Sequence, residues 1–133
     1  MEIGQKIEFT YTVQEKDLAK YVGVDEQDQF PEVLATARMI ALMEVCAARL
    51  MNPLVKEGEL SVGVNVNVMH LAPTLRDDLV TLKAIFQGME GKLYKFDVEI
   101  HDAGGIAGKG THTRAIIKTE RLLEGAKKRA SNT

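Results

Sequence analysis

The sequence predicts a single-domain α+β fold in which an antiparallel sheet of about five strands wraps against one long buried helix. Nearly all of the helical signal lies in one segment, the residues after it change from a 3.6-residue to a two-residue period, and glycine-bearing turns separate the strand candidates. With 133 residues, 45% of them hydrophobic, the chain is long enough for one core and too short for two domains. We therefore expect one domain over residues 1–133, with a flexible tail from about residue 122.

The helix is expected over residues 31–51. Its first residue is proline and Glu32 follows, and both are favourable at a helix N-terminus. Asn52-Pro53 ends it, because the proline ring cannot continue a helix. After Glu32 only three of its residues are charged, so we expect a helix that is apolar around most of its circumference and largely buried.

One strand candidate precedes the helix and four follow it. The first after the helix alternates valine with small or polar residues, so that its valines share the face that the helix would cover. Glycine-bearing hairpin turns at 88–91 and 102–105 join the last three. The candidates are residues 6–13, 61–71, 79–87, 92–101 and 106–118, and the valine face comprises Val62, Val64, Val66 and Val68.

Composition narrows the classes of function. The net charge of −2 and the scattered basic residues argue against nucleic acid as a partner. No stretch is apolar enough for a signal peptide or a membrane helix, so we expect no membrane partner. Cys46 is the single cysteine, which rules out an intramolecular disulfide and favours a reducing, cytoplasmic location.

Glu44 breaks the apolar pattern of the helix. Its neighbours three and four residues away are Ile40, Ala41, Ala47 and Ala48, none of which can pair with a carboxylate. Burying an unpaired carboxylate costs several kcal/mol or raises its pKa. We therefore expect Glu44 either to form a salt bridge with an arginine or lysine of a strand or to act as a functional acid or base.

Two other residues have chemistry that suggests a site. His70 continues the valine series, so its ring points to the helix side at the end of its strand, where it is either a satisfied core histidine or a site residue. Thr36 lies in the first turns of the helix, where free N–H groups and the helix dipole favour negative charge. Taken by itself, Thr36 is interpreted as a residue on the helix surface.

The spacing of Thr36 and Glu44 constrains how they can act together. Eight residues correspond to roughly 12 Å along a helix and about 80° around it, so the two side chains cannot hydrogen-bond within one chain. Either a substrate spans the gap, or a symmetric dimer combines Thr36 of one subunit with Glu44 of the other.

Two motif-like features carry no site. Residues 103–110 are a near miss to a phosphate-binding loop but precede a strand rather than a helix, and Gly108 and Gly110 are better explained by a bulge or a close backbone approach. The histidines lack paired metal-ligand spacing, so we expect no metal site; they are His70, His101 and His112.

The order of elements resembles the hotdog fold, a curved antiparallel sheet around one long helix. Five segments narrow the resemblance to the fluoroacetyl-CoA-thioesterase-like family, and the similarity runs from about residue 6 to residue 121. These segments are FPEVLAT at 30–36, Leu42-Met43-Glu44, Gly63, Val68-Met69-His70 and GKGTHTR at 108–114.

The resemblance implies the site residues and the assembly. It assigns Thr36, Glu44 and His70 as catalytic, with substrate-binding roles for Gly63 beside the acyl group, Phe30 as an aromatic gate, and Arg114. It also implies a homodimer, alone or as a dimer of dimers, with two sites at the interface and no cofactor, since CoA is part of the substrate. Residues 22–29 before the helix are polar and contain no aromatic residue, so we expect a small or medium acyl group other than the fluorinated one.

The predicted function is hydrolysis of an acyl-CoA thioester to the free acid and CoA. His70 would act as general base, Thr36 as nucleophile or water-positioning hydroxyl, and Glu44 would orient His70 or activate the second water. Two alternatives remain open. One is a hydratase or dehydratase on the same fold, which needs an Asp/His pair that is not seen around the helix; the other is a non-catalytic acyl-CoA-binding module.

Overall fold

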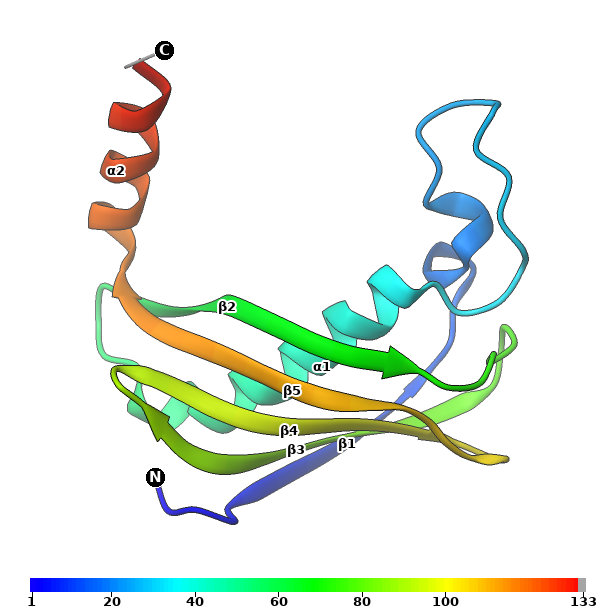
Figure 1. Ribbon diagram of the computed structural model, residues 1–133, viewed down its shortest axis with the longest axis horizontal. Helices are drawn as coiled ribbons and strands as arrows, with labels where there is room; N and C mark the ends of the chain where they lie inside the picture. Colours follow the sequence, from blue (N-terminus) through cyan, green and yellow to red (C-terminus); the bar gives the residue numbers. More distant parts are fainter. Residues whose placement is uncertain (132–133) are drawn as a thin grey trace.

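The computed structural model describes residues 1–131, in which five antiparallel strands form one curved sheet and a single long helix lies against it (Figure 1). This is the predicted α+β arrangement. The helices and strands are β1 (Lys6–Thr12), α1 (Thr36–Met51), β2 (Glu59–His70), β3 (Leu79–Glu90), β4 (Leu93–Asp102), β5 (Gly105–Lys118) and α2 (Thr119–Ser131). Short 3-10 turns occupy Glu15–Asp17, Ala19–Tyr21 and Asn52–Leu54.

The strand order across the sheet is β1-β3-β4-β5-β2, with β2 and β1 at the two edges. Glycines with positive φ make the two hairpins, Gly91 (φ 61°) between β3 and β4 and Gly105 (φ 116°) at the start of β5, because other residues rarely adopt this conformation. All five predicted strands are present, with ends that coincide with the expected ones or differ from them by up to three residues.

Helix α1 begins at Thr36, five residues later than predicted from the proline. The preceding residues are extended because other segments bind their N–H groups: Leu34 N donates to the Thr74 carbonyl and Ala35 N donates to the Asp17 carbonyl. Ala35 itself is extended, with ψ of 141°. These tertiary hydrogen bonds leave Thr36 as the first residue of the helix.

The prediction that the helix covers four valines of β2 is wrong in part. The register against β5 shifts between Gly63 and Asn65, and such a bulge reverses which side chains face inward. Gly63 therefore faces α1, with the Glu44 carboxylate beside the position of a Cβ. His70 faces α1 as predicted, since it contacts Thr36. Val64 remains 54% exposed.

The core lies between α1 and the middle strands. From the helix it takes Met39, Met43, Cys46, Ala47 and Met51, and from β3 and β4 it takes the alternate residues Val80, Leu82, Ala84, Phe86, Phe96, Val98 and Ile100. Gly108 allows the helix to approach β5, because a Cβ there would stand 2.5 Å from the sulfur of Met39. At Gly110, a Cβ would collide with the Asn67 carbonyl oxygen and the Val68 Cα of β2, which confirms the close backbone approach that the glycines of β5 suggested.

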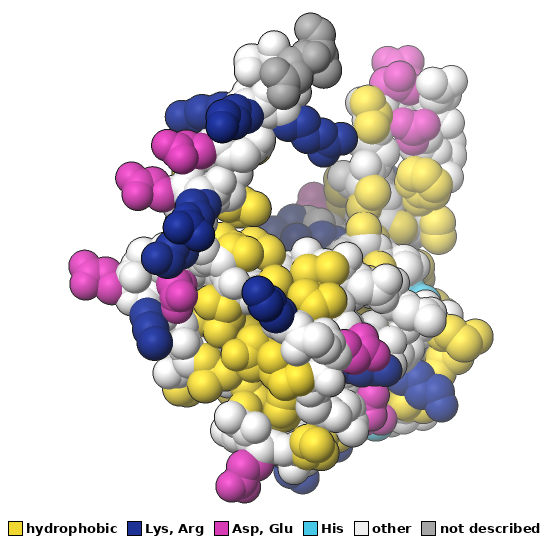
Figure 2. Space-filling model, turned by 60° about the vertical axis from the view of Figure 1, so that its left-hand side comes forward, with side chains coloured by type: hydrophobic (Ala, Val, Ile, Leu, Met, Phe, Trp, Pro, Cys, Tyr) yellow, Lys and Arg dark blue, Asp and Glu magenta, His cyan; other side chains and the backbone are white. Residues whose placement is uncertain are grey.

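Helix α2 occupies the segment that the sequence analysis expected as a flexible tail; the last two residues of that segment lie outside the described residues. It projects away from the sheet (Figure 1) and buries none of its residues. Figure 2 shows hydrophobic side chains gathered below α2, with lysine and arginine side chains of the helix standing above them. Within residues 1–131, no helix is long and apolar enough to cross a membrane.

A buried carboxylate anchors the segment before α1. The Asp17 side chain is fully buried and accepts hydrogen bonds from the Tyr11 hydroxyl (2.6 Å), the Gln14 N–H (2.9 Å) and Arg38 Nε (2.9 Å). Burial alone would raise the pKa of Asp17, but these donors outweigh it and lower the pKa below the ordinary 3.8. The ion pair therefore connects β1 and the first 3-10 turn to the first turn of α1.

We expect Asp17→Asn to lower the free energy of unfolding by about 1–3 kcal/mol, because the amide cannot accept from all three donors. Because the folded pKa is depressed, the contribution of the carboxylate is present above pH 3.8 and is lost as the pH falls through the folded pKa. Urea unfolding of both proteins at several pH values measures this. Asp77→Asn, at an exposed carboxylate, is the control with an expected change below about 0.5 kcal/mol; equal losses in the two variants would contradict the anchoring role.

Candidate active site

Thr36 and His70 meet where α1 begins and β2 ends. Thr36 Oγ1 and His70 Nδ1 are 2.8 Å apart, which is hydrogen-bonding distance. The strand stops at His70 because the N–H groups of Leu71 and Ala72 both turn to the Ala107 carbonyl. The sequence assigned both residues to one site, and the fold brings them together.

A surface pocket of about 370 Å³ opens beside this pair. It is lined by Ala19, Pro31, Val33, Leu34, Thr36, His70, Leu71, Ala72 and Pro73. Phe30 adjoins the lining residue Pro31 in the chain, and its side chain is half-exposed. The pocket is therefore mostly apolar, with one hydroxyl and one imidazole as its reactive groups.

The surroundings of His70 favour the neutral imidazole. Burial lowers the pKa of His70, and the neighbouring Ala72 backbone only partly opposes this shift. Among the described residues, Nε2 is buried and lacks a hydrogen-bond partner. A neutral ring whose Nδ1 is unprotonated accepts a hydrogen bond from the Thr36 hydroxyl, which is the arrangement of a general base beside its proton donor.

Glu44 lies further along α1, in a second polar cluster. Its Oε2 accepts a hydrogen bond from Arg114 Nη1 on β5 at 2.8 Å. The arginine side chain is 7% exposed and the glutamate side chain 42%. The prediction that Glu44 needs a partner outside the helix is confirmed. The partner is an arginine of a strand, as the salt-bridge alternative expected.

Gly63 leaves the room that the carboxylate occupies. A Cβ at this position would stand 2.8 Å from Glu44 Oε2 and 3.2 Å from His112 Cε1. In the sheet Gly63 is the register partner of Arg114. These contacts place Gly63, Glu44 and Arg114, three of the predicted site residues, in one cluster.

The two clusters do not join within one chain. In the described part of the chain, the hydrogen bonds pair His70 with Thr36 and Glu44 with Arg114, and none links Glu44 to His70. The carboxylate therefore does not orient His70 of its own subunit. This agrees with the helix geometry, which separates Thr36 from Glu44.

The sequence analysis assigned no role to His112, which belongs to the second cluster. The side chain is 1% exposed and its Nε2 lies 3.2 Å from Arg114 Nη1. The sequence did contain a signal for His112. Residues two apart on a strand share a face, and Arg114 was already a candidate site residue.

Comparison with known proteins identifies the family. The family model of the fluoroacetyl-CoA-specific thioesterase matches residues 13–120. A fluoroacetyl-CoA thioesterase from Streptantibioticus cattleyicolor is 32% identical over 124 residues, which cover 92% of this chain and 89% of that protein. The chain belongs to the fluoroacetyl-CoA-specific thioesterase family.

Solved structures agree with this assignment. The structure of the fluoroacetyl-CoA thioesterase FlK superposes with a TM-score of 0.91 at 31% identity and covers 96% of both chains. A thioesterase superfamily member from Thermus thermophilus superposes with a TM-score of 0.85 at 26% identity, covering 99% of this chain and 97% of the other. The predicted hotdog fold and the predicted thioester hydrolase activity are thereby confirmed.

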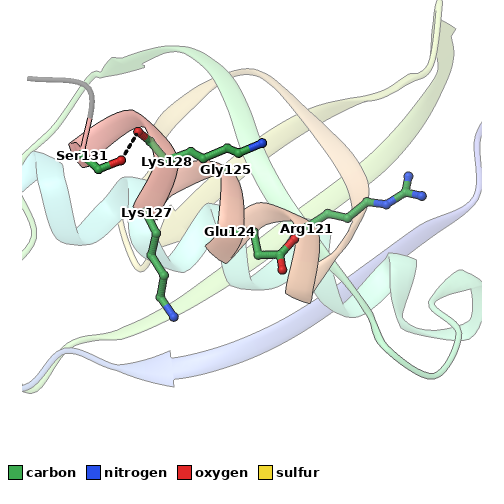
Figure 3. A pocket seen from close by; sticks show the side chains of 6 residues that line it. All are labelled: Arg121, Glu124, Gly125, Lys127, Lys128 and Ser131. Carbon is green, nitrogen blue, oxygen red and sulfur yellow. Dashed lines mark hydrogen bonds between the residues drawn. The ribbon is translucent and has the colours of Figure 1, made fainter.

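A larger hollow, of about 750 Å³, lies along α2 and is lined by none of the predicted site residues. All of its lining residues come from that one helix; they are Arg121, Glu124, Gly125, Lys127, Lys128 and Ser131 (Figure 3). The hollow is thus the open side of a projecting helix rather than a cleft between elements. The structure also holds, over residues 1–131, no group of three or more His, Cys, Asp or Glu side chains placed to bind a metal ion.

We expect the pKa of His70 to lie below its ordinary 6.5, because burial disfavours the imidazolium. The neutral base is then present at neutral pH and is lost as the pH falls through that lower pKa. A pH titration of the histidine Cε1–H resonances by NMR, with His70→Asn to assign the signal, measures the value. A His70 pKa at or above 6.5 would contradict the described surroundings.

Proposed function

We propose that this thioesterase hydrolyses the CoA thioester of a small or medium acyl group, releasing the free acid and CoA. The observation that carries the proposal is the 2.8 Å contact between Thr36 Oγ1 and His70 Nδ1 at the start of α1, beside an apolar pocket. A hydroxyl paired with a neutral imidazole is the arrangement that activates a weak oxygen nucleophile.

In the proposed reaction, His70 Nδ1 removes a proton from the Thr36 hydroxyl, or from a water held by it, as the oxygen attacks the thioester carbonyl. His70 then returns the proton to the CoA sulfur as the carbon–sulfur bond breaks. The carbonyl oxygen becomes negative, and the N–H groups of the first turn of α1 or a backbone N–H near Gly63 stabilise it. The first turn of α1 is available because no side chain caps it.

If Thr36 is the nucleophile, the acyl group resides on its oxygen and a second water must release it. The half-exposed Glu44 carboxylate is the proposed base for that water. CoA is part of the substrate, and the proposed steps use neither a metal ion nor a redox cofactor.

The acyl group is proposed to be small or medium and without fluorine. The pocket of about 370 Å³ suits a short chain. The segment over residues 22–29 is polar, with Asp28 accepting hydrogen bonds from the N–H groups of Val24 and Asp25, so Phe30 is the aromatic residue that the segment before the helix offers as a gate. Its half-exposed side chain supports that role.

We also propose that the active enzyme is a homodimer with shared sites. Within one chain Glu44 is hydrogen-bonded to Arg114, whereas His70 is hydrogen-bonded to Thr36. Strand β2 is an edge of the sheet and exposes Val64, Val66 and Met69, which is a surface that an antiparallel partner strand would cover. A second copy would then bring its Glu44 to the Thr36–His70 pair, whether as a dimer or a dimer of dimers.

A cytoplasmic location is proposed from the cysteine. Cys46 is buried in the core and burial raises the pKa of its thiol to about 11, so it remains a protonated core residue that needs no oxidising compartment.

The first test is turnover of an acyl-CoA series of increasing chain length, fluoroacetyl-CoA included, measured as released thiol. We expect Thr36→Val and His70→Asn to lower kcat about 100-fold or more, because each removes one member of the hydroxyl–base pair. Thr36→Ser should keep most of the activity.

The control is Thr10→Val, on the exposed side of β1, at the sheet edge opposite to the one formed by β2 and His70. Turnover unchanged by Thr36→Val, His70→Asn and Glu44→Gln would refute the assignment. Thermal stabilisation by CoA esters without released thiol would support a binding module, and release of a hydrated or dehydrated acyl-CoA would support a hydratase.

A mixture of two inactive proteins tests the shared site. In dimers of Thr36→Val with Glu44→Gln, one of the two sites combines an intact Thr36 with an intact Glu44. Co-refolding equal amounts should therefore restore roughly a quarter of the wild-type activity, since half of the dimers are mixed and each has one intact site. No restoration, with mixed dimers shown by mass spectrometry, would mean that each subunit completes its own site.

A further inference from the structure

His112 is a buried histidine with two polar contacts that differ in kind. It lies on β5 with 1% of its surface exposed. Its Nδ1 is 2.7 Å from the carbonyl oxygen of Asn65, and its Nε2 is 3.2 Å from Arg114 Nη1. Both distances are those of hydrogen bonds.

These two partners define the protonation state of the ring. A carbonyl oxygen can only accept, so Nδ1 carries the proton; a guanidinium can only donate, so Nε2 is unprotonated. His112 is therefore neutral. The charged groups around it are Arg114 of its own strand and Glu44 of α1, whereas β2 contributes the Asn65 carbonyl and β4 the apolar Phe96 opposite it.

The same contacts decide where the guanidinium of Arg114 lies. Its Nε donates to Ser61 Oγ at 3.1 Å and its Nη2 donates to the Ser61 carbonyl at 3.0 Å. Nη1, on the opposite side, donates to Glu44 and to His112. Ser61 and His112 thus hold the guanidinium from two sides, and the position of the Glu44 carboxylate follows from it.

We propose that His112 is a positioning residue for the Glu44 carboxylate, acting through Arg114. By accepting a hydrogen bond on Nε2, the neutral ring directs Nη1 of Arg114 toward the position beside Gly63 where the carboxylate lies. The inference rests on the proposed function, because it assigns His112 to the half of the site that Glu44 supplies.

The alternative role for His112 is a structural one at the β-bulge. Asn65, whose carbonyl accepts the hydrogen bond from Nδ1, is the first residue after the register shift of β2. If His112 only supports this bulge, the activity depends on the Nδ1–H donor and does not depend on the Nε2 acceptor. The two roles therefore depend on different nitrogen atoms of the same ring.

Two polar variants separate these roles. His112→Gln can place its amide oxygen near the position of Nε2 and keep the acceptor for Arg114. His112→Asn can place its amide nitrogen near Nδ1 and keep the donor for Asn65. We expect kcat to fall about 10- to 100-fold in His112→Asn with KM changed less than about threefold, because a displaced catalytic group costs rate rather than binding. His112→Gln should stay within about threefold of wild type.

The kcat of the His112→Gln and His112→Asn variants is also measured in a Glu44→Gln background. If His112 acts through Glu44, His112→Asn should lower kcat there by less than about threefold, since coupled residues are not additive. Val98→Ala, a buried change on β4 outside the site, controls for lost stability and should lower kcat equally in both backgrounds. The proposal would be overturned if His112→Asn lowered kcat by the full 10- to 100-fold in the Glu44→Gln background. It would also be overturned if His112→Gln lowered kcat more than His112→Asn does.

A readout independent of turnover distinguishes this inference from the proposed function. Restricted rotation of the Arg114 guanidinium gives separate Nη resonances in NMR spectra. We expect them in wild type and His112→Gln and expect them to merge in His112→Asn. If wild type hydrolyses no acyl-CoA, the proposed function fails while this measurement still tests the role of His112.

Discussion

The packing of α1 against the sheet is the constraint on which the rest of the structure depends. Methionine, cysteine and alanine side chains on one side of the helix enter the core, and this fixes the rotation of the helix about its axis. Thr36 and Glu44 then point toward the neighbouring strands instead of into the apolar core. The hydroxyl meets His70 of β2, and the carboxylate meets Arg114 of β5.

The polar groups beside this core are stabilised as connected sets rather than as isolated pairs. Asp17 receives three donors where the chain enters α1, and Arg114 donates to Ser61, Glu44 and His112. Such sets are costly to bury unless every member is hydrogen-bonded. The fold therefore places two separate networks along α1, one at its start and one near its middle, and these two positions carry the groups of the proposed reaction.

Much of the architecture was predictable because it depends on local patterns. The period change after residue 51 and the glycines near residues 91 and 105 were sufficient to place the four strands that follow the helix. The start of α1 was not, since proline and Glu32 favour a helix locally while the N–H groups of Leu34 and Ala35 find acceptors in distant segments. The predicted valine face of β2 was wrong in part for a similar reason, because the position of a bulge depends on the partner strand.

For the site, the amino-acid sequence by itself determined which residues are candidates. A carboxylate without a helical partner, a histidine ending a valine strand and a threonine near a helix start were visible as departures from pattern, and their spacing indicated that one helix could not join them. Only the tertiary structure decided the partners. Sequence separation hides contacts such as Glu44 with Arg114, 70 residues apart, because pairing of β2, β5 and α1 brings them together. The tertiary structure also decided the proposed role of His112, because this role depends on the hydrogen-bond partners of its two ring nitrogens.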